Sequence, residues 1–302
     1  MDFHASPSSI AKFFAGRTLY GAGLDDDGHI IDQLIRERTI GLSRHPLWPA
    51  ARPILYRLFG HAEAVRMADA IAPMPGWEAF QYLSALLSLD IQVRGLENVP
   101  VEGGFILAPN HPTGIADGIA MFDALKPRRT DMAIFANRDA LRVAPGFRDI
   151  IIPVEWRAGE KSHAKSRDTL EMTARAFSSR KAVVLFPSGR IAYWHEGELT
   201  ERPWQTSAVA LARRFETPVV PVHITARNSG LFYFLAKHST ELRDMTLFHE
   251  LLNKKRFVFT ITIGKPVPAS MLDGDAAEVT ARLQDHTVHA LRADPEAVFT
   301  PA

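Results

Sequence analysis

Short β-rich runs alternate with helical patterns from residue 90 onwards, and this alternation constrains the fold more than any other feature of the sequence. Each run is rich in the residues that favour strands. The runs are IQVRGL, GFILAPN, DMAIFAN, DIIIPVE, KAVVLFPSG, TPVVPVHIT and RFVFTITIG. We expect helices between them over residues 117–125, 163–178, 204–215, 231–252 and 276–291. Because strands that alternate with helices pair through crossovers, the sequence predicts an α/β fold with a mixed, largely parallel sheet flanked by helices.

The first 89 residues have a different pattern, in which apolar residues recur at helical spacing and prolines separate the pieces. The sequence therefore predicts an N-terminal helical region over residues 1–89 and an α/β domain over residues 90–302. The apolar stretch 79–89 is too short to span a bilayer, so any membrane contact would be peripheral. Aromatic side chains of this region could lie in a membrane interface, although a core position is the default at helical spacing. They are Phe13, Phe14, Trp48, Trp77 and Phe80.

The chain contains no cysteine, and this excludes several kinds of chemistry at once. Thiol nucleophiles, cysteine-ligated zinc, iron–sulfur clusters and disulfides are all excluded. His286 and His289 have a spacing that could hold a metal, but no third ligand accompanies them, and we expect an exposed helix face instead. His195 and Glu196 lack the second histidine of the HExxH zinc motif. We therefore predict neither a bound metal nor a resident cofactor.

Charge is balanced over the whole chain but not along it. The chain has 35 Lys and Arg and 34 Asp and Glu, whereas residues 126–190 contain 14 basic and 7 acidic residues. This basic segment suggests an anionic partner, which could be a phosphate-bearing co-substrate, an acidic lipid surface or nucleic acid. A solvated face is the alternative. Since no zinc-finger or aromatic RNA-binding motif accompanies the basic residues, we expect no nucleic-acid partner.

Polar residues follow two of the predicted strands, in the position where α/β sheets bind ligands. NHPTGIADG occupies residues 110–118, after the run GFILA, and PSGR occupies residues 187–190, after AVVLF. His111 on the loop and Asp117 in the first turn of the next helix could contact each other. The carboxylate would then hold the imidazole Nδ1–H while Nε2 takes a proton from a hydroxyl group. The alternative is a helix-capping aspartate beside a structural histidine.

Taken together, NHPTGIADG, FPSGR at 186–190 and VVPVHI at 219–224 resemble the blocks of the glycerolipid O-acyltransferase family. The lysophosphatidic acid acyltransferase type has four residues between its histidine and aspartate and a glutamate in its second block. This chain has five intervening residues, and Ser188 stands in place of the glutamate. Both departures resemble a bacterial branch that is often labelled as hemolysins and includes the ornithine-lipid acyltransferases. The stretch 226–267 is similar to this branch too, so the resemblance covers roughly residues 45–268.

The resemblance implies both a glycerolipid acyltransferase fold and an activity. A fatty acyl group would move from acyl-CoA or acyl-carrier protein, as co-substrate, to a hydroxyl of a lysolipid in phospholipid, glycerolipid or ornithine-lipid synthesis. His111 is implied as the general base and Asp117 as its orienting partner. The flanks of the first block, Asn110 and Gly118, have a turn and a close helix approach as their simple structural roles. The implied substrate-binding residues are Asn110, Gly118, Arg138, Phe186, Pro187, Ser188, Gly189 and Arg190.

Further details follow from the same resemblance. The missing glutamate implies an acceptor head other than that of lysophosphatidic acid, since a serine offers only a neutral hydroxyl. Backbone N–H groups at the start of the helix that carries Asp117 could stabilise the oxyanion of a tetrahedral intermediate. Pro221 matches the last block, with a structural or acyl-tunnel role. Arg138, Arg142 and Arg148 follow the third strand, where the family places substrate contacts, and salt bridges within the fold are the alternative.

Two other functions stay open on the sequence alone. A serine-type lipid hydrolase could use Ser188 with His111 and Asp117, although the sequence has no G-x-S-x-G elbow. A non-catalytic protein could bind anionic lipid through the basic segment, but the His/Asp pair would then have no role. No apolar core follows a basic start in residues 1–10, so we expect no signal peptide. The leading interpretation is an acyltransferase bound peripherally to the anionic cytoplasmic face of a membrane.

Overall fold

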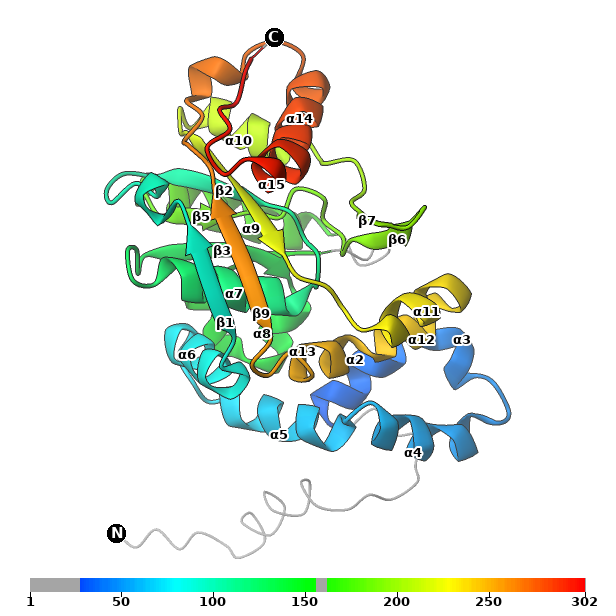
Figure 1. The fold of residues 1–302 in the computed structure, drawn as a ribbon. Coiled ribbons are helices and arrows are strands. Elements are labelled where there is room, and N and C mark those ends of the chain that lie inside the picture. Colours follow the sequence, from blue (N-terminus) through cyan, green and yellow to red (C-terminus); the bar gives the residue numbers. More distant parts are fainter. Residues whose placement is uncertain (1–27, 156–161, 302) are drawn as a thin grey trace, which may run out of the picture.

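The computed structural model describes residues 28–155 and 162–301 (Figure 1). All seven predicted runs form strands of one sheet. The strands are β1 Asp90–Arg94, β2 Phe105–Pro109, β3 Met132–Asn137, β4 Ile151–Val154, β5 Ala182–Val184, β8 Val219–Thr225 and β9 Val258–Ile263. Their order in the sheet is β1-β9-β8-β2-β5-β3-β4. A separate antiparallel hairpin consists of β6 Tyr193–His195 and β7 Glu198–Thr200.

Parallel pairing dominates the sheet. β2 pairs in parallel with β5 and β8, and β3 pairs in parallel with β4 and β5. β8 and β9 are antiparallel, so β9 and its parallel neighbour β1 run in the opposite direction. The prediction of a mixed, largely parallel sheet is confirmed. The carboxyl ends of β8, β2, β5, β3 and β4 consequently meet at one edge, where open α/β sheets bind their ligands.

Alternate residues of the central strands face two different hydrophobic cores. Leu107 of β2 and Val184 of β5 join one core, whereas their neighbours Ile106 and Val183 join the other. A strand buried on both faces has a continuous apolar sequence, and every residue of β2 is buried. The first core contains helix α7 (Ile115–Leu125), and the second contains α9 (His163–Ser178), α10 (Ser207–Arg214) and α14 (Ala276–Asp285).

The N-terminal part that the structure describes is helical, as predicted, and it shares the first core with the sheet. Figure 1 shows its helices, in blue and cyan, beneath the sheet. They are α2 Ile30–Arg38, α3 Ile40–Ser43, α4 Trp48–Leu58, α5 His61–Ile71 and α6 Gly76–Leu87. Leu34, Ile71 and Leu83 from three of these helices are buried in the same cluster as Leu107 of the central strand. The boundary at residue 90 stays a prediction, and removal of residues 1–89 would expose one side of this core.

The aromatic side chains of this region pack inward where the structure describes them. Phe80 is buried, and its ring lies 5.1 Å from that of Phe122 of α7. Trp77 meets the same ring edge-on at 4.7 Å, and Trp48 is half-buried against the first core. The core interpretation therefore holds for these three. No helix within the described residues is long and apolar enough to cross a membrane. Outside the described residues lie Phe13 and Phe14.

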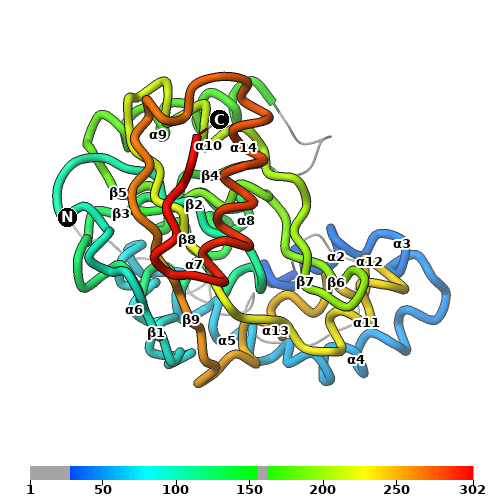
Figure 2. Tube along the Cα trace, turned by 45° about the horizontal axis from the view of Figure 1, so that its top comes forward, coloured from blue at the N-terminus to red at the C-terminus, as the bar shows by residue number. Residues whose placement is uncertain are grey.

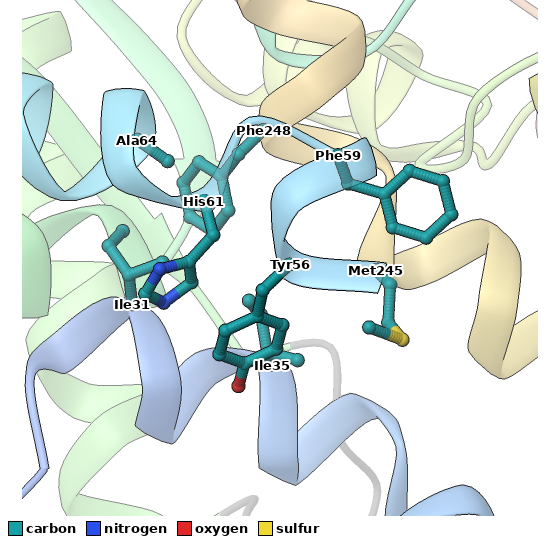
Figure 3. Close-up of a pocket in the computed structure, with 8 residues that line it drawn as sticks. All are labelled: Ile31, Ile35, Tyr56, Phe59, His61, Ala64, Met245 and Phe248. Atoms are coloured by element: carbon teal, nitrogen blue, oxygen red, sulfur yellow. The ribbon is translucent and has the colours of Figure 1, made fainter. Parts of the chain in front are cut away.

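A small cavity lies among these helices and is shown in Figure 3. The Tyr56 ring stacks on the His61 ring at 4.1 Å, and His61 Nε2 lies 3.0 Å from Asp32 Oδ1. Burial raises the pKa of Tyr56, and the neighbouring Asp32 carboxylate raises it further. The cluster joins α2, α4 and α5, and none of the predicted site residues lines the cavity. Its other lining residues are Ile31, Ile35, Phe59, Ala64, Met245 and Phe248.

The predicted helix over 231–252 is wrong, because three helices occupy this stretch. They are α11 Gly230–His238, α12 Thr240–Met245 and α13 Leu247–Leu252. Ser239 has an extended backbone, with φ of −155°, and its side chain accepts the N–H of Leu242. It therefore ends α11 and caps α12, which is a common role of serine at helix starts.

The predicted exposed helix face at His286 is also wrong. Here α14 is followed by a π-helical turn, His286–Ala290, and by the short α15 Leu291–Ala293. The turn directs His286 inward, where it is buried against the edge of the Phe299 ring at 5.7 Å, and burial lowers its pKa. His289 is exposed, as expected. Within residues 28–155 and 162–301, no group of three His, Asp or Glu could hold a metal ion.

Candidate active site

His111 and Asp117 contact each other at the carboxyl end of the central strand. β2 ends at Pro109, residues 110–114 form a loop, and Asp117 lies in the first turn of α7. His111 Nδ1 lies 2.9 Å from Asp117 Oδ2. The Asp117 side chain is fully buried, whereas the His111 side chain is 18% exposed, so a ligand could reach the imidazole but not the carboxylate. The contact suggested by the motif is present.

Asp117 also caps the helix that carries it. Its Oδ2 accepts the backbone N–H groups of Thr113 and Gly114 at 2.8 and 2.9 Å, and its Oδ1 accepts the Thr113 hydroxyl at 2.5 Å. The capping aspartate and the histidine's partner are therefore the same residue. A carboxylate can only accept, so the proton of a neutral His111 lies on Nδ1 and the lone pair on Nε2.

Two glycines of the first block differ in their structural roles. Gly114 has φ of +95°, and a Cβ there would lie 2.6 Å from Ile191 Cδ1, so the loop requires glycine. A Cβ on Gly118 would meet nothing within 4 Å. The close helix approach expected at Gly118 is therefore wrong, and the half-buried surface beside it is open.

Asn110 extends the strand pairing beyond the end of β2. Its Nδ2 donates to the Ile224 carbonyl at 3.0 Å, and its Oδ1 accepts the Ile224 N–H at 2.6 Å. Both polar atoms are thus bound by β8, and the side chain fixes the start of the loop. Pro221 lies within β8, opposite Ala108, and its carbonyl accepts the Gly264 N–H. This position gives Pro221 a structural role within the sheet.

The second block lies beside His111 because β5 and β2 are neighbours. The Phe186 ring packs on the imidazole at 4.3 Å between centroids. The Pro187 carbonyl accepts the Gln205 N–H at 2.9 Å, so this proline holds the chain that leads into α10. An apolar ring therefore packs against the imidazole of His111.

The rest of the second block forms a turn with its own hydrogen bonds. Ser188 is buried, and its Oγ donates to the Arg190 carbonyl at 2.9 Å. Gly189 occupies the left-handed region with φ of +60°, and Arg190 is exposed. No hydrogen bond joins Ser188 to His111 in the part of the chain that the structure describes. The structure therefore offers no support for a nucleophilic role of Ser188.

The arginines after β3 form salt bridges. Arg138 Nη1 lies 2.8 Å from Asp168 Oδ2, and Arg148 pairs with the same carboxylate. Burial by itself raises the pKa of Asp168, but the two guanidinium groups lower it overall. Arg142 binds Glu37 of α2 at 2.7 Å. All three arginines thus form the salt bridges that the sequence left open as the alternative to substrate contacts. Substrate binding by Arg138 stays a prediction.

Other cations of the basic segment are paired as well. Lys126 binds Asp123, Arg129 binds Asp131 and Lys165 binds Glu155. Neighbouring carboxylates therefore reduce the positive potential that the sequence predicted for residues 126–190, including carboxylates from outside that segment. Binding of an anionic partner by this segment stays a prediction.

One carboxylate beside His111 was not predicted. Glu201 follows β7, and its Oε1 accepts the backbone N–H of His111 while its Oε2 accepts Trp204 Nε1–H at 2.6 Å. Burial raises the pKa of Glu201, against the opposing effect of these two hydrogen bonds. Glu201 lies 90 residues from His111 in a segment without a motif, so only the tertiary structure brings the two together.

Asn228 supports the loop from the other side. Its Nδ2 donates to the Thr113 carbonyl at 3.2 Å, and its own N–H donates to the Tyr233 hydroxyl at 3.1 Å. The next residue, Ser229, donates its N–H and its hydroxyl to Glu250 of α13. Asn228 belongs to the stretch 226–267 that resembles the bacterial branch, and this was the available signal for it.

Comparison with known proteins finds related acyltransferases. A family model described as Acyltransferase matches residues 90–225. The lyso-glycine lipid O-acyltransferase of Phocaeicola vulgatus is 30% identical over 193 residues, which cover 62% of this chain and 67% of that protein. The chain belongs to the glycerolipid acyltransferase family. The lyso-glycine lipid O-acyltransferase of Bacteroides thetaiotaomicron is 28% identical over 193 residues, covering 62% of this chain and 69% of that protein.

A solved structure is also similar to this acyltransferase. It is the 1-acyl-sn-glycerophosphate acyltransferase PlsC of Thermotoga maritima, with a TM-score of 0.47, 15% identity, and coverage of 86% of this chain and 97% of that one. The family match over residues 90–225 contains both blocks and Pro221. The predicted family is confirmed by the relative from Phocaeicola vulgatus, which is 30% identical and is covered over 67% of its length.

Proposed function

We propose that this acyltransferase moves a fatty acyl group from acyl-CoA or acyl-carrier protein to a hydroxyl of a lysolipid, with His111 as the general base. The observation that carries the proposal is the 2.9 Å contact of a reachable imidazole with a fully buried carboxylate. Such a contact orients the ring and stabilises the imidazolium that forms when Nε2 takes a proton.

The reaction needs one base and no enzyme-bound acyl group. Nε2 of His111 takes the proton of the lysolipid hydroxyl as its oxygen attacks the thioester carbonyl. The new C–O bond forms, the C–S bond of the tetrahedral intermediate breaks, and the thiolate leaves. The imidazolium then gives its proton to the thiolate, which restores the enzyme. Because a thiolate is a good leaving group, a single histidine suffices.

The oxyanion of the intermediate needs hydrogen-bond donors held in place beforehand. The N–H groups of Thr113 and Gly114 are bound to Asp117, so the next donors along the first turn of α7 are those of Ile115 and Ala116. We infer that these two donors stabilise the oxyanion, with the positive end of the helix dipole behind them.

The acceptor is proposed to be a lysolipid with an amino-acid head rather than lysophosphatidic acid. Two similar proteins are lyso-glycine lipid O-acyltransferases, and Ser188 replaces the glutamate of the lysophosphatidic acid type. Lyso-glycine lipid and lyso-ornithine lipid should therefore be acylated at least as well as lysophosphatidic acid. The test is incubation of the purified protein with labelled acyl-CoA or acyl-carrier protein and each lysolipid, followed by separation of the lipid products.

The same incubation distinguishes direct transfer from the hydrolase alternative. Intact-protein mass spectrometry during turnover should show no acyl adduct, and Ser188→Ala should change turnover only modestly. An acyl group mapped to Ser188, together with loss of activity in Ser188→Ala, would establish a serine nucleophile instead. Binding of lipid without any acyl transfer would support the non-catalytic alternative.

We also propose that the chain binds anionic membranes peripherally, through α3, α4 and the turn between them. Residues 39–62 contain no Asp or Glu, and Arg44, Arg52 and Arg57 are exposed there. Leu47 and Ile54 are 66% and 69% exposed on the same segment. Exposed apolar residues interspersed with arginines favour an anionic lipid surface, where each cation contributes on the order of 1 kcal/mol.

A second exposed apolar group supports the same orientation. Trp194 of β6 and Phe234 of α11 are 50% and 61% exposed. Figure 2 shows that α3, α4, α11 and the β6–β7 hairpin lie at one end of the molecule. Trp194 packs against Tyr233 at 5.8 Å, and Tyr233 binds Asn228 beside the His111 loop. The proposed membrane surface would therefore adjoin the reacting group.

A further inference from the structure

We propose that Glu201 is a positioning residue for His111 and that its negative charge stabilises the imidazolium formed during acyl transfer. This inference rests on the proposed role of His111 as the base. Two buried carboxylates contact one partly exposed histidine: Asp117 binds the His111 ring, and Glu201 binds the His111 backbone.

The segment around the β6–β7 hairpin encloses the backbone of His111 from both sides. Ala192, before β6, donates its N–H to the His111 carbonyl at 2.9 Å. Glu201, after β7, accepts the His111 N–H. Ile191 occupies the space that a side chain on Gly114 would need. Residues on both sides of the β6–β7 hairpin therefore hold the backbone of His111 in place.

Glu201 is itself held by an anchored partner. Trp204 Nε1–H donates to its Oε2 at 2.6 Å, and the Trp204 ring is buried in the second core. The Trp204 N–H donates to Gln284 Oε1 of α14 at 3.0 Å, and Gln284 Nε2 donates to the Arg202 carbonyl at 3.0 Å. Each Glu201 oxygen thus faces an N–H donor. Both hydrogen bonds favour the ionised carboxylate and so oppose burial, which raises the pKa of Glu201.

Both carboxylates that contact His111 are buried. Asp117 and Glu201 are the carboxylates that bind His111, and the other contact on the ring is the apolar face of Phe186. Burial raises the pKa of Glu201 most, the charge of His111 lowers it, and the charge of Asp117 raises it. Two buried negative charges repel each other until the proton arrives on Nε2. Their attraction to the imidazolium is then realised mainly in the transition state, which is the condition for catalysis.

Three variants of the full-length chain test the inference. Glu201→Gln removes the charge and keeps an acceptor for the His111 N–H, while its NH₂ group faces the Trp204 N–H donor. Glu201→Asp keeps the charge but has a shorter side chain. Glu198→Gln is the matched control, since Glu198 is an exposed carboxylate of the same hairpin. The measurements are kcat and KM for acyl transfer and the pH profile of kcat/KM, with circular dichroism as the check on folding.

For Glu201→Gln we expect kcat to fall at least about tenfold with KM nearly unchanged. The acid limb of its kcat/KM profile should move to lower pH, because an imidazolium without the nearby charge loses its proton more readily. Glu201→Asp should lose part of kcat while its acid limb stays at the wild-type pH, and Glu198→Gln should match wild type. A purely structural role would lower the plateau without moving the limb.

Three results would overturn the inference: a wild-type kcat in folded Glu201→Gln, an unmoved acid limb in that variant, or a loss confined to KM. If Glu201→Gln does not fold, Glu201→Asp provides the test. Wild-type kinetics of Glu201→Asp would contradict the positioning role of Glu201. His111→Ala separates this inference from the proposed function. An active His111→Ala contradicts the base itself, whereas an inactive one with a wild-type-like Glu201→Gln contradicts only the role of Glu201.

Discussion

At the scale of single residues, Asp117 combines a helix cap with an orienting contact to His111, and substitutions separate the two. His111→Ala should lower kcat at least about a hundredfold without unfolding the chain, which is the usual scale of a lost general base. Asp117→Asn should lose a similar factor, because an amide favours the wrong tautomer of the imidazole. It should also lose about 1–3 kcal/mol of stability, since an NH₂ group would face donors that the carboxylate accepted.

Steady-state kinetics and urea unfolding measure these two effects separately. Asp123→Asn is the matched control on the same helix, since its carboxylate binds Ser84 and Lys126 rather than the loop. A well-folded His111→Ala protein with near-normal turnover would contradict the mechanism. An Asp117→Asn variant with unchanged stability would contradict the cap.

His223 gives a pH dependence of stability at the same scale. Burial lowers the pKa of His223 to about 4, although the hydrogen bond to the Thr287 carbonyl opposes this. The unfolded chain binds a proton near pH 6.5, and the folded chain binds it only near pH 4. The contribution is therefore complete above pH 6.5 and is lost as pH falls from 6.5 to 4, with a total on the order of 3 kcal/mol.

His223→Asn removes the titration and keeps a donor for the Thr287 carbonyl. Urea unfolding of both proteins from pH 7 to pH 4 should show a difference in unfolding free energy that shrinks as the wild type loses stability. A difference that stays constant over this range would contradict the assignment. His286 has a lowered pKa for the same reason, and its contribution cancels in the comparison.

At the scale of elements, a buried ion pair connects α13 to the start of α11. Lys254 Nζ lies 3.0 Å from Glu250 Oε2, and both side chains are 2% exposed. Glu250 also accepts the N–H and hydroxyl of Ser229, the N-cap of α11. Glu250→Gln should cost about 3 kcal/mol or more, because it leaves the Lys254 charge buried without its partner.

A double variant tests whether the loss comes from the orphaned charge. Glu250→Gln with Lys254→Met should recover much of the unfolding free energy in urea, since no buried charge then remains at this position. Glu63→Gln is the control, because it breaks the exposed pair with Lys255 and should cost less than about 1 kcal/mol. Equal losses in the single and double variants would contradict the explanation.

At the scale of the whole molecule, one end carries the exposed apolar and basic residues proposed to meet a membrane. Ile54→Ser with Leu58→Ser should reduce flotation with anionic liposomes several-fold, since both side chains are at least 60% exposed on α4. Leu170→Ser with Val298→Ser is the control, because these side chains are equally exposed on other elements. High salt should weaken binding of the wild type.

Liposome composition tests the electrostatic part. Equal binding to neutral and anionic vesicles at every ionic strength would contradict a role for the arginines of residues 39–62. Unchanged flotation of the Ile54/Leu58 variant would contradict this surface altogether. These surface substitutions are preferable to removing residues 1–89, which contribute buried side chains to the first core.

Sequence patterns correctly predicted the structural features that depend on residues close together in the chain. The seven strands, the helix over 163–178 and the parallel character of the sheet were all predicted, because a strand buried on both faces must be continuously apolar. The contact of His111 with Asp117 could also be predicted from the sequence. The two residues are only six apart, and a strand end, a loop and a first helical turn bring them together. The family followed from these short blocks.

The tertiary structure decided what depends on distant segments. The apolar periodicity predicted one helix over 231–252, but Ser239 ends the first helix there because its side chain caps the next one. The spacing of His286 predicted an exposed position, but a π-helical turn buries it. Some cations of the basic segment are paired with carboxylates far away in the sequence, as Arg142 is with Glu37. Glu201 reaches His111 across 90 residues, because β5 lies beside β2 and the chain after it returns past the loop. Sequence patterns thus determined the sheet and the contact of His111 with Asp117, whereas packing between distant segments placed Glu201 beside His111.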